Sequence, residues 1–297
     1  FYNRENTIGR TISSVLKQTF EDWELVIVDD GSDDNNLLVR IVNQFDDSRI
    51  QVLFQKQNLG GGAARNIGML AAKGEYIAFL DSDDEWENNK LEKQVEFHKN
   101  KSKHLVSYTK SVIHYGVDEN PQEPLPAQAI EKGERIADYL FVKGGFIQSS
   151  SLFGFRSVFI QCLFDTTLRR HQDYDFLLSL EKKGCEFEMI DEVLVHIHWE
   201  DVGTKSGDRF YCPDVSAHFI ETRKEFFSNQ SAAAFRLNNV FAPLRVKEGL
   251  RKSLYKGFWG DLMRVKIWRV RLVSLSLLFF KTTLPLKLLF KLYKFFK

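Results

Sequence analysis

The sequence predicts an α/β protein with a mostly parallel central sheet, helices on both faces of that sheet, and a basic amphipathic helical tail. Short, continuous apolar runs alternate with segments of helical periodicity over residues 7–80, as in doubly wound sheets. Acidic clusters follow two of the apolar runs, and ligands of such sheets lie beyond the carboxyl ends of the strands. The tail, in contrast, combines Lys and Arg with Leu and Phe.

The expected elements follow from these periods. Apolar residues three or four apart predict helices at residues 7–18, 37–45, 60–74, 86–100 and 171–184. Continuous or alternating apolar runs predict strands at residues 25–28, 50–55, 76–80, 107–116 and 187–199. Residues 146–160 are apolar but follow neither period.

Charge divides the chain of 297 residues unevenly. Residues 245–297 hold 14 Lys and Arg against 2 Asp and Glu, a net of +12, whereas the rest carries −11. We therefore expect two regions, a body at residues 1–230, with halves at 1–100 and 101–230, and a helical, membrane-associating region at 231–297. The three widely spaced cysteines support neither a disulfide framework nor a zinc site, which favours a reducing compartment.

Three carboxylates follow the apolar run at residues 76–80. Side chains two apart in an extended segment face the same way, so Asp81 and Asp83 can reach one ion. Oxygen-only ligands suit Mg²⁺ or Mn²⁺, which proteins often share with substrate phosphates. The alternative is an acidic turn that caps the next helix.

Two further segments suit a nucleotide. Asp29 and Asp30 end a buried apolar run, and Gly31 permits a turn after them. A carboxylate there can accept hydrogen bonds from a base or a ribose. The alternative is that the next residues cap a helix. The glycines of residues 58–66 let backbone approach an anion at a helix start. Their spacing matches neither dinucleotide-binding nor P-loop motifs, and Arg65 has two possible partners, a phosphate or a nearby Asp.

A general base is also available. Asp173 and Asp175 open the helix expected at 171–184, where a carboxylate either takes a proton or stabilises the helix start. His196 and His198 share one face of the strand expected at 187–199. Either is a possible metal ligand, and a structural role is the alternative.

In this order, the segments YN (2–3), VDDGS (28–32), NLGGGAARNIG (58–68), YIAFLDSDDEW (76–86) and HQDYDF (171–176) resemble family 2 glycosyltransferases of the GT-A fold. The resemblance implies a nucleotide-sugar donor, usually UDP-linked, and a divalent metal, Mn²⁺ or Mg²⁺. It implies that Asp173 is the catalytic base and that Asp83, in the family's Asp-x-Asp motif, binds the metal with His198. The nucleotide-binding residues that it implies are Tyr2, Asn3, Asp29, Asp30, Asn58, Gly60, Arg65, Asp81 and Ser82.

The sequence departs from the family in three places. The family's opening strand, which normally precedes Tyr2, is absent, and we expect such a strand to come before this sequence. Gln172 stands where the family usually has Glu. The Gln-x-x-Arg-Trp motif of processive synthases is also absent, so we expect the transfer of one sugar per event, with inversion. The alternatives are a sugar nucleotidyltransferase and a non-catalytic, membrane-bound nucleotide-binding module.

The tail predicts a membrane partner. Its longest uncharged run, Leu272–Phe280, is shorter than the roughly 20 residues that a spanning helix needs. Lys287, Lys291 and Lys294 recur at helical spacing among Leu and Phe, which is typical of a helix in the membrane interface. Packing on the protein itself or on a protein partner is the alternative, and no nucleic-acid partner is expected. We expect a cytoplasmic enzyme, peripheral on the inner membrane face, with a saccharide acceptor that by family analogy is linked to undecaprenyl diphosphate.

Overall fold

The computed structural model describes residues 1–116, 123–199, 212–241, 258 and 260–265. By internal contacts the chain forms two compact units. The first comprises residues 1–136 and 145–202, and the second comprises residues 137–144 and 203–297. The expected functional division at residues 230 and 231 remains a prediction.

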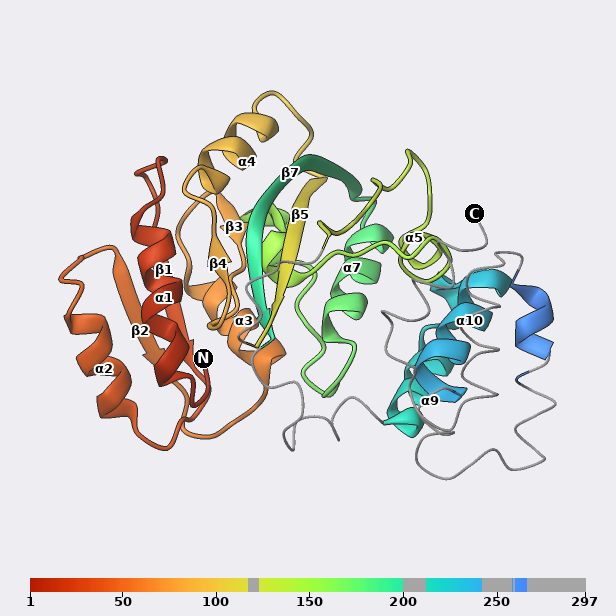
Figure 1. The fold of residues 1–297 in the computed structure, drawn as a ribbon, viewed down its shortest axis with the longest axis horizontal. Coiled ribbons are helices and arrows are strands. Elements are labelled where there is room, and N and C mark those ends of the chain that lie inside the picture. The colour runs from red at the N-terminus through yellow and green to blue at the C-terminus, as the bar shows by residue number, and fades with distance from the viewer. Residues whose placement is uncertain (117–122, 200–211, 242–257, 259, 266–297) are drawn as a thin grey trace. The chain divides into compact units, whose positions relative to one another are not determined.

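The first unit confirms the α/β class (Figure 1). Its helices and strands alternate along the chain as the periodicity predicts. The helices are α1 (Glu5–Leu16), α2 (Asn35–Asn43), α3 (Gly61–Ala71), α4 (Lys90–His98), α6 (Arg156–Phe159) and α7 (Gln172–Lys182), with the short turn η1 (Ser149–Ser151). The strands are β1 (Leu25–Asp29), β2 (Ile50–Phe54), β3 (Tyr76–Ala78), β4 (Glu85–Trp86), β5 (Leu105–Tyr115), β6 (Phe153–Phe155) and β7 (Glu186–Trp199).

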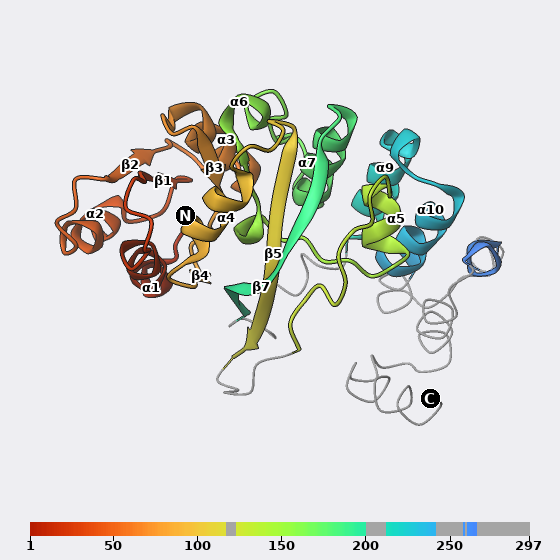
Figure 2. The same cartoon turned by 90° about the horizontal axis from the view of Figure 1, so that it is seen from above.

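The sheets are mixed, so the expectation of a mostly parallel sheet is wrong. β1 and β2 pair in parallel, with Asp29 opposite Phe54. A second sheet has the order β3-β6-β5-β7-β4, in which only β5 and β7 are parallel. Figure 2 shows these two long strands side by side. A continuous apolar run predicts burial on both faces but not direction, and β6, which reverses the direction between β3 and β5, lies in the segment without a clear period.

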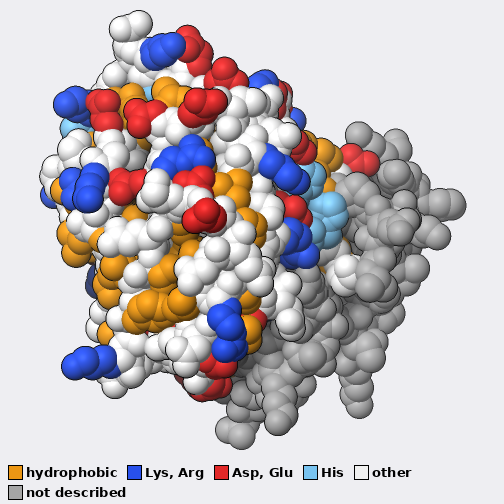
Figure 3. Space-filling model, turned by 90° about the vertical axis from the view of Figure 1, so that its left-hand side faces the viewer, with side chains coloured by type: hydrophobic (Ala, Val, Ile, Leu, Met, Phe, Trp, Pro, Cys, Tyr) orange, Lys and Arg blue, Asp and Glu red, His pale blue; other side chains and the backbone are white. Residues whose placement is uncertain are grey.

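Helix α1 packs on its neighbours through its apolar face, and other residues of the helix contact the loop after β3. Ile8, Ile12 and Val15 are buried, as their spacing predicts. Ile8 and Ile12 join a cluster with Ile27 of β1 and Leu38 of α2. The helix therefore packs on the β1–β2 layer. Figure 3 shows the side of the molecule that lies on the left in Figure 1, where apolar side chains lie among charges of both signs.

The second unit is helical in its described part. It contains α5 (Ile136–Phe141), of which only Ile136 is assigned to the first unit, and then α9 (Pro213–Thr222), η2 (Lys224–Phe226), α10 (Asn229–Arg236) and η3 (Leu237–Phe241). The rings of Phe141, Phe219, Phe227 and Phe235 pack on one another. Within the residues described, no helix is long and apolar enough to cross a bilayer. Of the region expected to associate with the membrane, residues 231–297, only 231–241, 258 and 260–265 are described, and the lysines at 287, 291 and 294 fall outside the described residues.

Candidate active site

The acidic loop after β3 is held in place by α1. Thr7 Oγ1 donates to the carbonyl of Ser82 (2.8 Å), Arg10 Nη2 to that of Asp83 (2.8 Å) and Thr11 Oγ1 to that of Asp84 (2.9 Å). Residues 7, 10 and 11 lie on one face of the helix because they are three or four apart. The helix thus fixes three successive carbonyl groups, and the carboxylates of the loop are free to point elsewhere.

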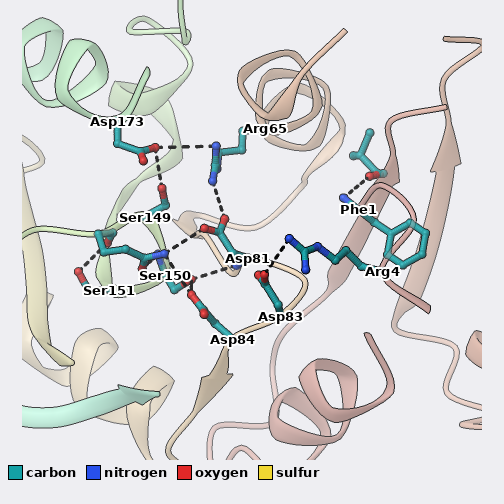
Figure 4. Close-up of polar contacts among 12 residues, drawn as sticks. Phe1, Arg4, Arg65, Asp81, Asp83, Asp84, Ser149, Ser150, Ser151 and Asp173 are labelled. Carbon is teal, nitrogen blue, oxygen red and sulfur yellow. Dashed lines mark hydrogen bonds and ion pairs between the residues drawn. The ribbon is translucent and has the colours of Figure 1, made fainter. Parts of the chain in front are cut away.

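Arg65 of α3 lies between Asp81 and Asp173 (Figure 4). Its Nη2 is 2.5 Å from Asp81 Oδ1, and its Nη1 is 3.8 Å from Asp173 Oδ1. Burial lowers the pKa of Arg65, but the attraction of Asp81 and Asp173 outweighs burial, and the pKa rises. Of the two partners left open by the sequence, the structure brings Arg65 to the nearby Asp81.

Asp84 is the most buried carboxylate of the loop, with 2% of its surface exposed. It accepts hydrogen bonds from Ser150 Oγ (2.7 Å), Gln148 Nε2 (3.1 Å) and the backbone N–H of His198 (3.3 Å). Burial first, and then the charge of Asp81, raises the pKa of Asp84 to about 8. Sequence reasoning counted Asp84 among the acids but gave it no role.

Asp83 is partly exposed and lies near charges of both signs, since Asp81 raises its pKa whereas Arg4 and Arg10 lower it. Its side chain is 26% exposed and lies 3.6 Å from Arg4. Burial and the charge of Asp81 raise its pKa, as happens when carboxylates crowd together. Crowded oxygen ligands suit Mg²⁺ or Mn²⁺. Within the described ranges, however, no three His, Cys, Asp or Glu residues are placed to hold a metal, so a cation here would depend on substrate oxygens and water.

His198, expected to be a second metal ligand, contacts a different acid. Its Nε2 lies 2.9 Å from Glu85 Oε1 of β4. Its ring also stacks on His114, with the centroids 4.7 Å apart. Burial is the main cause that lowers the pKa of His198, followed by the charge of Arg10. Its role as a metal ligand remains a prediction.

Asp173 stands in the first turn of α7, where its side chain is 43% exposed. Its Oδ1 accepts a hydrogen bond from Ser149 Oγ at 2.8 Å. The residue before this helix, His171, has a left-handed backbone with φ 65°. Gln172, which replaces the family's usual Glu, donates instead to the carbonyl of Leu168. The carboxylate of Asp173 is thus oriented by Ser149 and Arg65.

Asp29 and Asp30 organise the loops at the end of β1. Both are buried, and Asp30 accepts hydrogen bonds from Gln55 Nε2 (2.9 Å) and from the N–H groups of Leu59 and Gly60 (both 2.8 Å). Asp29 instead accepts hydrogen bonds from the N–H and hydroxyl groups of Ser32. Asp30 therefore positions the Gly-rich turn before α3. Contact of either acid with a nucleoside remains a prediction.

The first three residues run beside the same strand end. The backbone of Phe1 exchanges hydrogen bonds with Val28 (3.0 Å) and Asp30 (2.8 Å). Asn3 forms a pair of hydrogen bonds with Asp33, at 2.9 and 3.0 Å, and Tyr2 is 40% exposed. This places Tyr2 and Asn3 next to the loop that follows Asp30.

The remaining two expected nucleotide ligands have different surroundings. Asn58 is exposed, directly before the turn that Asp30 holds. Ser82 lies in the acidic loop, and its carbonyl is taken by Thr7. Their contacts with a nucleotide stay predictions.

Residues 1–163, more than half of the chain, match the sequence profile described as glycosyl transferase family 2. The chain belongs to this family. It is 30% identical over 254 residues to the amylovoran biosynthesis glycosyltransferase AmsB of Erwinia amylovora, covering 83% of this chain and 82% of the relative. It is 51% identical over 94 residues to the Escherichia coli UDP-Glc:alpha-D-GlcNAc-diphosphoundecaprenol beta-1,3-glucosyltransferase WfgD, covering 32% of this chain and 36% of the relative.

Solved structures of other glycosyltransferases share the fold. S. aureus TarS 1-349 aligns with a TM-score of 0.60 at 17% identity, over 93% of this chain and 84% of that protein. GalNAc-T7 aligns with a TM-score of 0.56 at 18% identity, over 86% of this chain and 52% of that protein. The family 2 chain therefore has the α/β architecture of GT-A glycosyltransferases.

Sequence reasoning missed one part of this glycosyltransferase site, the turn at residues 148–151. Ser149, Ser150 and Ser151 are each at most 1% exposed, and Gln148 precedes them. Three consecutive hydroxyl residues within an apolar run were an available signal, because buried polar groups need hydrogen-bond partners. The hydroxyl groups of Ser149 and Ser150 bond to the carboxylates of Asp173 and Asp84, and that of Ser151 bonds to the carbonyl of Gln148.

Proposed function

We propose that this family 2 glycosyltransferase moves one sugar from a UDP-sugar to a hydroxyl group of a lipid-linked saccharide, with inversion. The observation that supports the proposal is the position of Arg65. It contacts both Asp81, in the acidic loop after β3, and the candidate base, Asp173. A donor diphosphate at the loop and an acceptor at α7 would then lie within reach of each other.

The donor class is inferred from fold neighbours and relatives. TarS structures include complexes with UDP and with UDP-GlcNAc, and the GalNAc-T7 structure contains UDP, GalNAc and Mn²⁺. The name of WfgD states a UDP-glucose donor and a GlcNAc-diphosphoundecaprenol acceptor. AmsB and the putative colanic acid transferase WcaA of Escherichia coli K12 are named for surface polysaccharides. We infer a role in bacterial surface-polysaccharide synthesis.

The proposed chemistry assigns a task to each acid. Asp173 accepts the proton of the acceptor hydroxyl as that oxygen attacks the anomeric carbon opposite the leaving diphosphate, and UDP departs. Asp83 would hold Mn²⁺ or Mg²⁺ together with diphosphate oxygens and water, since such ions often take only one or two protein carboxylates. The bound ion would supply charge neutralisation for the leaving group. His198 would bind the ion only if its ring moved away from Glu85, so Asp83 is the stronger candidate for a metal ligand.

The test is UDP release. Purified protein is incubated with a panel of UDP-sugars and a polyprenyl-diphosphate-linked N-acetylglucosamine, with Mn²⁺ or with a chelator. Metal-dependent release of UDP and a lengthened lipid-linked saccharide are expected. Pyrophosphate as the product would instead indicate a nucleotidyltransferase. Binding of UDP-sugars without any product in all combinations would indicate a non-catalytic module and overturn the proposal.

Asp173→Asn tests the base. General-base catalysis typically contributes about 10²–10⁴ in rate, so transfer should fall by roughly that factor while UDP binding persists. The control is Asp214→Asn, because Asp214 is also an acid in the first turn of a helix, α9. If both variants lose activity equally, the effect comes from helix charge and the base assignment is wrong.

A further inference from the structure

We propose that the buried turn at residues 148–151 is the positioning element of the catalytic centre and that Ser149 is the positioning residue for Asp173. The inference rests on the proposed function, because it assigns Asp173 the role of base. The turn is a single 3₁₀ turn, η1, preceded by Gln148. It connects two parts of the site that come from distant segments of the chain, the loop after β3 and the start of α7.

The turn closes on itself. Gln148 Oε1 accepts the N–H of Ser150 at 2.6 Å, and Ser151 Oγ donates to the carbonyl of Gln148 at 2.7 Å. The three serines are almost fully buried, so alternative rotamers would leave hydroxyl groups without partners in a place that water does not reach. The local conformation is therefore fixed by its own hydrogen bonds.

The turn is also anchored from behind by side chains that contact its backbone. Trp86 Nε1 donates to the carbonyl of Ser150 at 2.9 Å, and Gln94 Nε2 donates to that of Ser151 at 3.1 Å. Trp86 and Gln94 are themselves buried. These anchors come from β4 and α4, so that the turn cannot shift without disturbing packed elements.

The carboxylates of the site contact the side chains of the turn (Figure 4). Gln148 Nε2 donates to both Asp81 (3.0 Å) and Asp84 (3.1 Å), and Ser150 Oγ donates to Asp84 while it accepts the backbone N–H of Asp81 (3.0 Å). Ser149 Oγ alone reaches α7, at Asp173 Oδ1. One rigid turn thus sets the distance between the acidic loop and the candidate base.

The bond from Ser149 determines which oxygen of Asp173 can act. Oδ1 is engaged by Ser149 at 2.8 Å and faces Arg65 at 3.8 Å. Within the described ranges, Oδ2 makes no hydrogen bond or ion pair, and the side chain is 43% exposed. Fixing Oδ1 presents Oδ2 in one direction, toward an incoming hydroxyl. A base displaced by about 1 Å can lose about 10²-fold in rate, so this orientation should matter for turnover and not for donor binding.

The test compares Ser149→Ala with Ser149→Thr and with Ser216→Ala, in the UDP-release assay with the same donor and lipid-linked acceptor. Ser216 of α9 is the matched control because its hydroxyl is also buried and donates to a backbone carbonyl, that of Cys212, outside the candidate site. We expect Ser149→Ala to lower kcat by about 10- to 100-fold with donor KM within about twofold, Ser149→Thr to restore most of kcat, and Ser216→Ala to keep it. Thermal unfolding of each variant shows whether a fall in kcat comes from misfolding. If Ser149→Ala misfolds, the kcat of Ser149→Thr tests the inference in its place.

A double-mutant cycle separates positioning from an independent effect. If Ser149 acts through Asp173, adding Ser149→Ala to Asp173→Asn should cause little further loss. Additive losses, or an equal fall in kcat for Ser149→Ala and Ser216→Ala, would overturn the inference and leave the proposed function standing. Unchanged transfer by Asp173→Asn alone would overturn the base assignment and the inference with it.

Discussion

The guanidinium group of Arg65 lies 2.5 Å from the carboxylate of Asp81, which joins helix α3 to the loop after β3. Arg65 is 19% exposed and Asp81 29%, so the pair is partly shielded from water. A second carboxylate, Asp173, lies 3.8 Å away from the same guanidinium. The arginine thus keeps two acids close together that would otherwise repel each other.

We expect Arg65→Ala to lower the free energy of unfolding by about 1–3 kcal/mol, because it leaves these two acids without their common partner in a partly buried place. The measurement is denaturant unfolding of the variant and of Lys99→Ala. Lys99 and its partner Glu96 are 60% and 66% exposed, and such a pair contributes about 0–0.5 kcal/mol. An equal loss of unfolding free energy in the two variants would mean that solvent screens the Arg65–Asp81 pair as well.

Much of the fold and part of the site followed from the sequence, for physical reasons. Continuous apolar runs and helical spacing identified β1 and α1 because burial imposes these patterns. The acids at 81–84 were placed at a strand end for the same reason. Strand direction in the β3–β6–β5 part was not predictable, since apolar content does not encode it.

The part of the site that escaped prediction depends on tertiary contacts. Ser149 meets Asp173 across 24 residues, and Gln148 meets Asp81 across 67, with no local signal of either pairing. The contact of Asp30 with a nucleoside stays a prediction, and the three hydrogen bonds that its two oxygens accept from the next loop had no signal in the sequence. Sequence identifies which residues carry the chemistry, whereas their partners depend on how distant segments pack.

Asp83→Asn should weaken the binding of UDP in the presence of Mn²⁺ by at least about tenfold, because an amide is a poor substitute for the carboxylate that such ions prefer. Calorimetric titration of UDP with Mn²⁺ or with chelator measures the effect. The control is Asp191→Asn, an acid 70% exposed on β7. Retained Mn²⁺-dependent affinity in Asp83→Asn would show that Asp83 is not a metal ligand.

Gly31→Ala should destabilise the nucleotide side of the site. Gly31 has φ 75°, and a Cβ atom there would lie 2.6 Å from the backbone carbon of Gln57, so both the conformation and the space disfavour a side chain. We expect a loss of about 1–3 kcal/mol in unfolding free energy together with weaker UDP binding. Thermal unfolding and UDP titration test this.

The matched control for Gly31 is Gly9→Ala in the interior of α1, where a Cβ atom would meet nothing within 4 Å. Alanine there should be neutral or stabilise by up to about 1 kcal/mol, because it restricts the unfolded chain and favours a helix. If Gly31→Ala has the same unfolding free energy and UDP affinity as Gly9→Ala, the loops at Gly31 and Gln57 move apart at little cost and are not held at a fixed distance.

His98 predicts how the stability of the first unit depends on pH. Its ring is 1% exposed, packs against Tyr76, Phe153 and Phe155, and has Nε2 3.0 Å from Ser107 Oγ. Burial, assisted by the charge of Lys101, lowers its pKa from 6.5 to about 4. In the protonated ring both nitrogens are donors, and Nδ1 has no hydrogen-bond partner in the part of the chain that the structure describes.

The sign of the effect follows from this lowered pKa. Between pH 6.5 and pH 4 the unfolded chain binds a proton at His98 that the folded chain refuses, so the stability present above pH 6.5 is lost as the pH falls to about 4. At about 1.4 kcal/mol per pKa unit the loss approaches roughly 3 kcal/mol. Denaturant unfolding across this range should therefore show a weaker acid dependence for His98→Gln than for the wild type. His104→Gln, at an exposed histidine, should show the acid dependence of the wild type. If all three proteins lost the same stability as the pH falls, folding would not lower the pKa of His98.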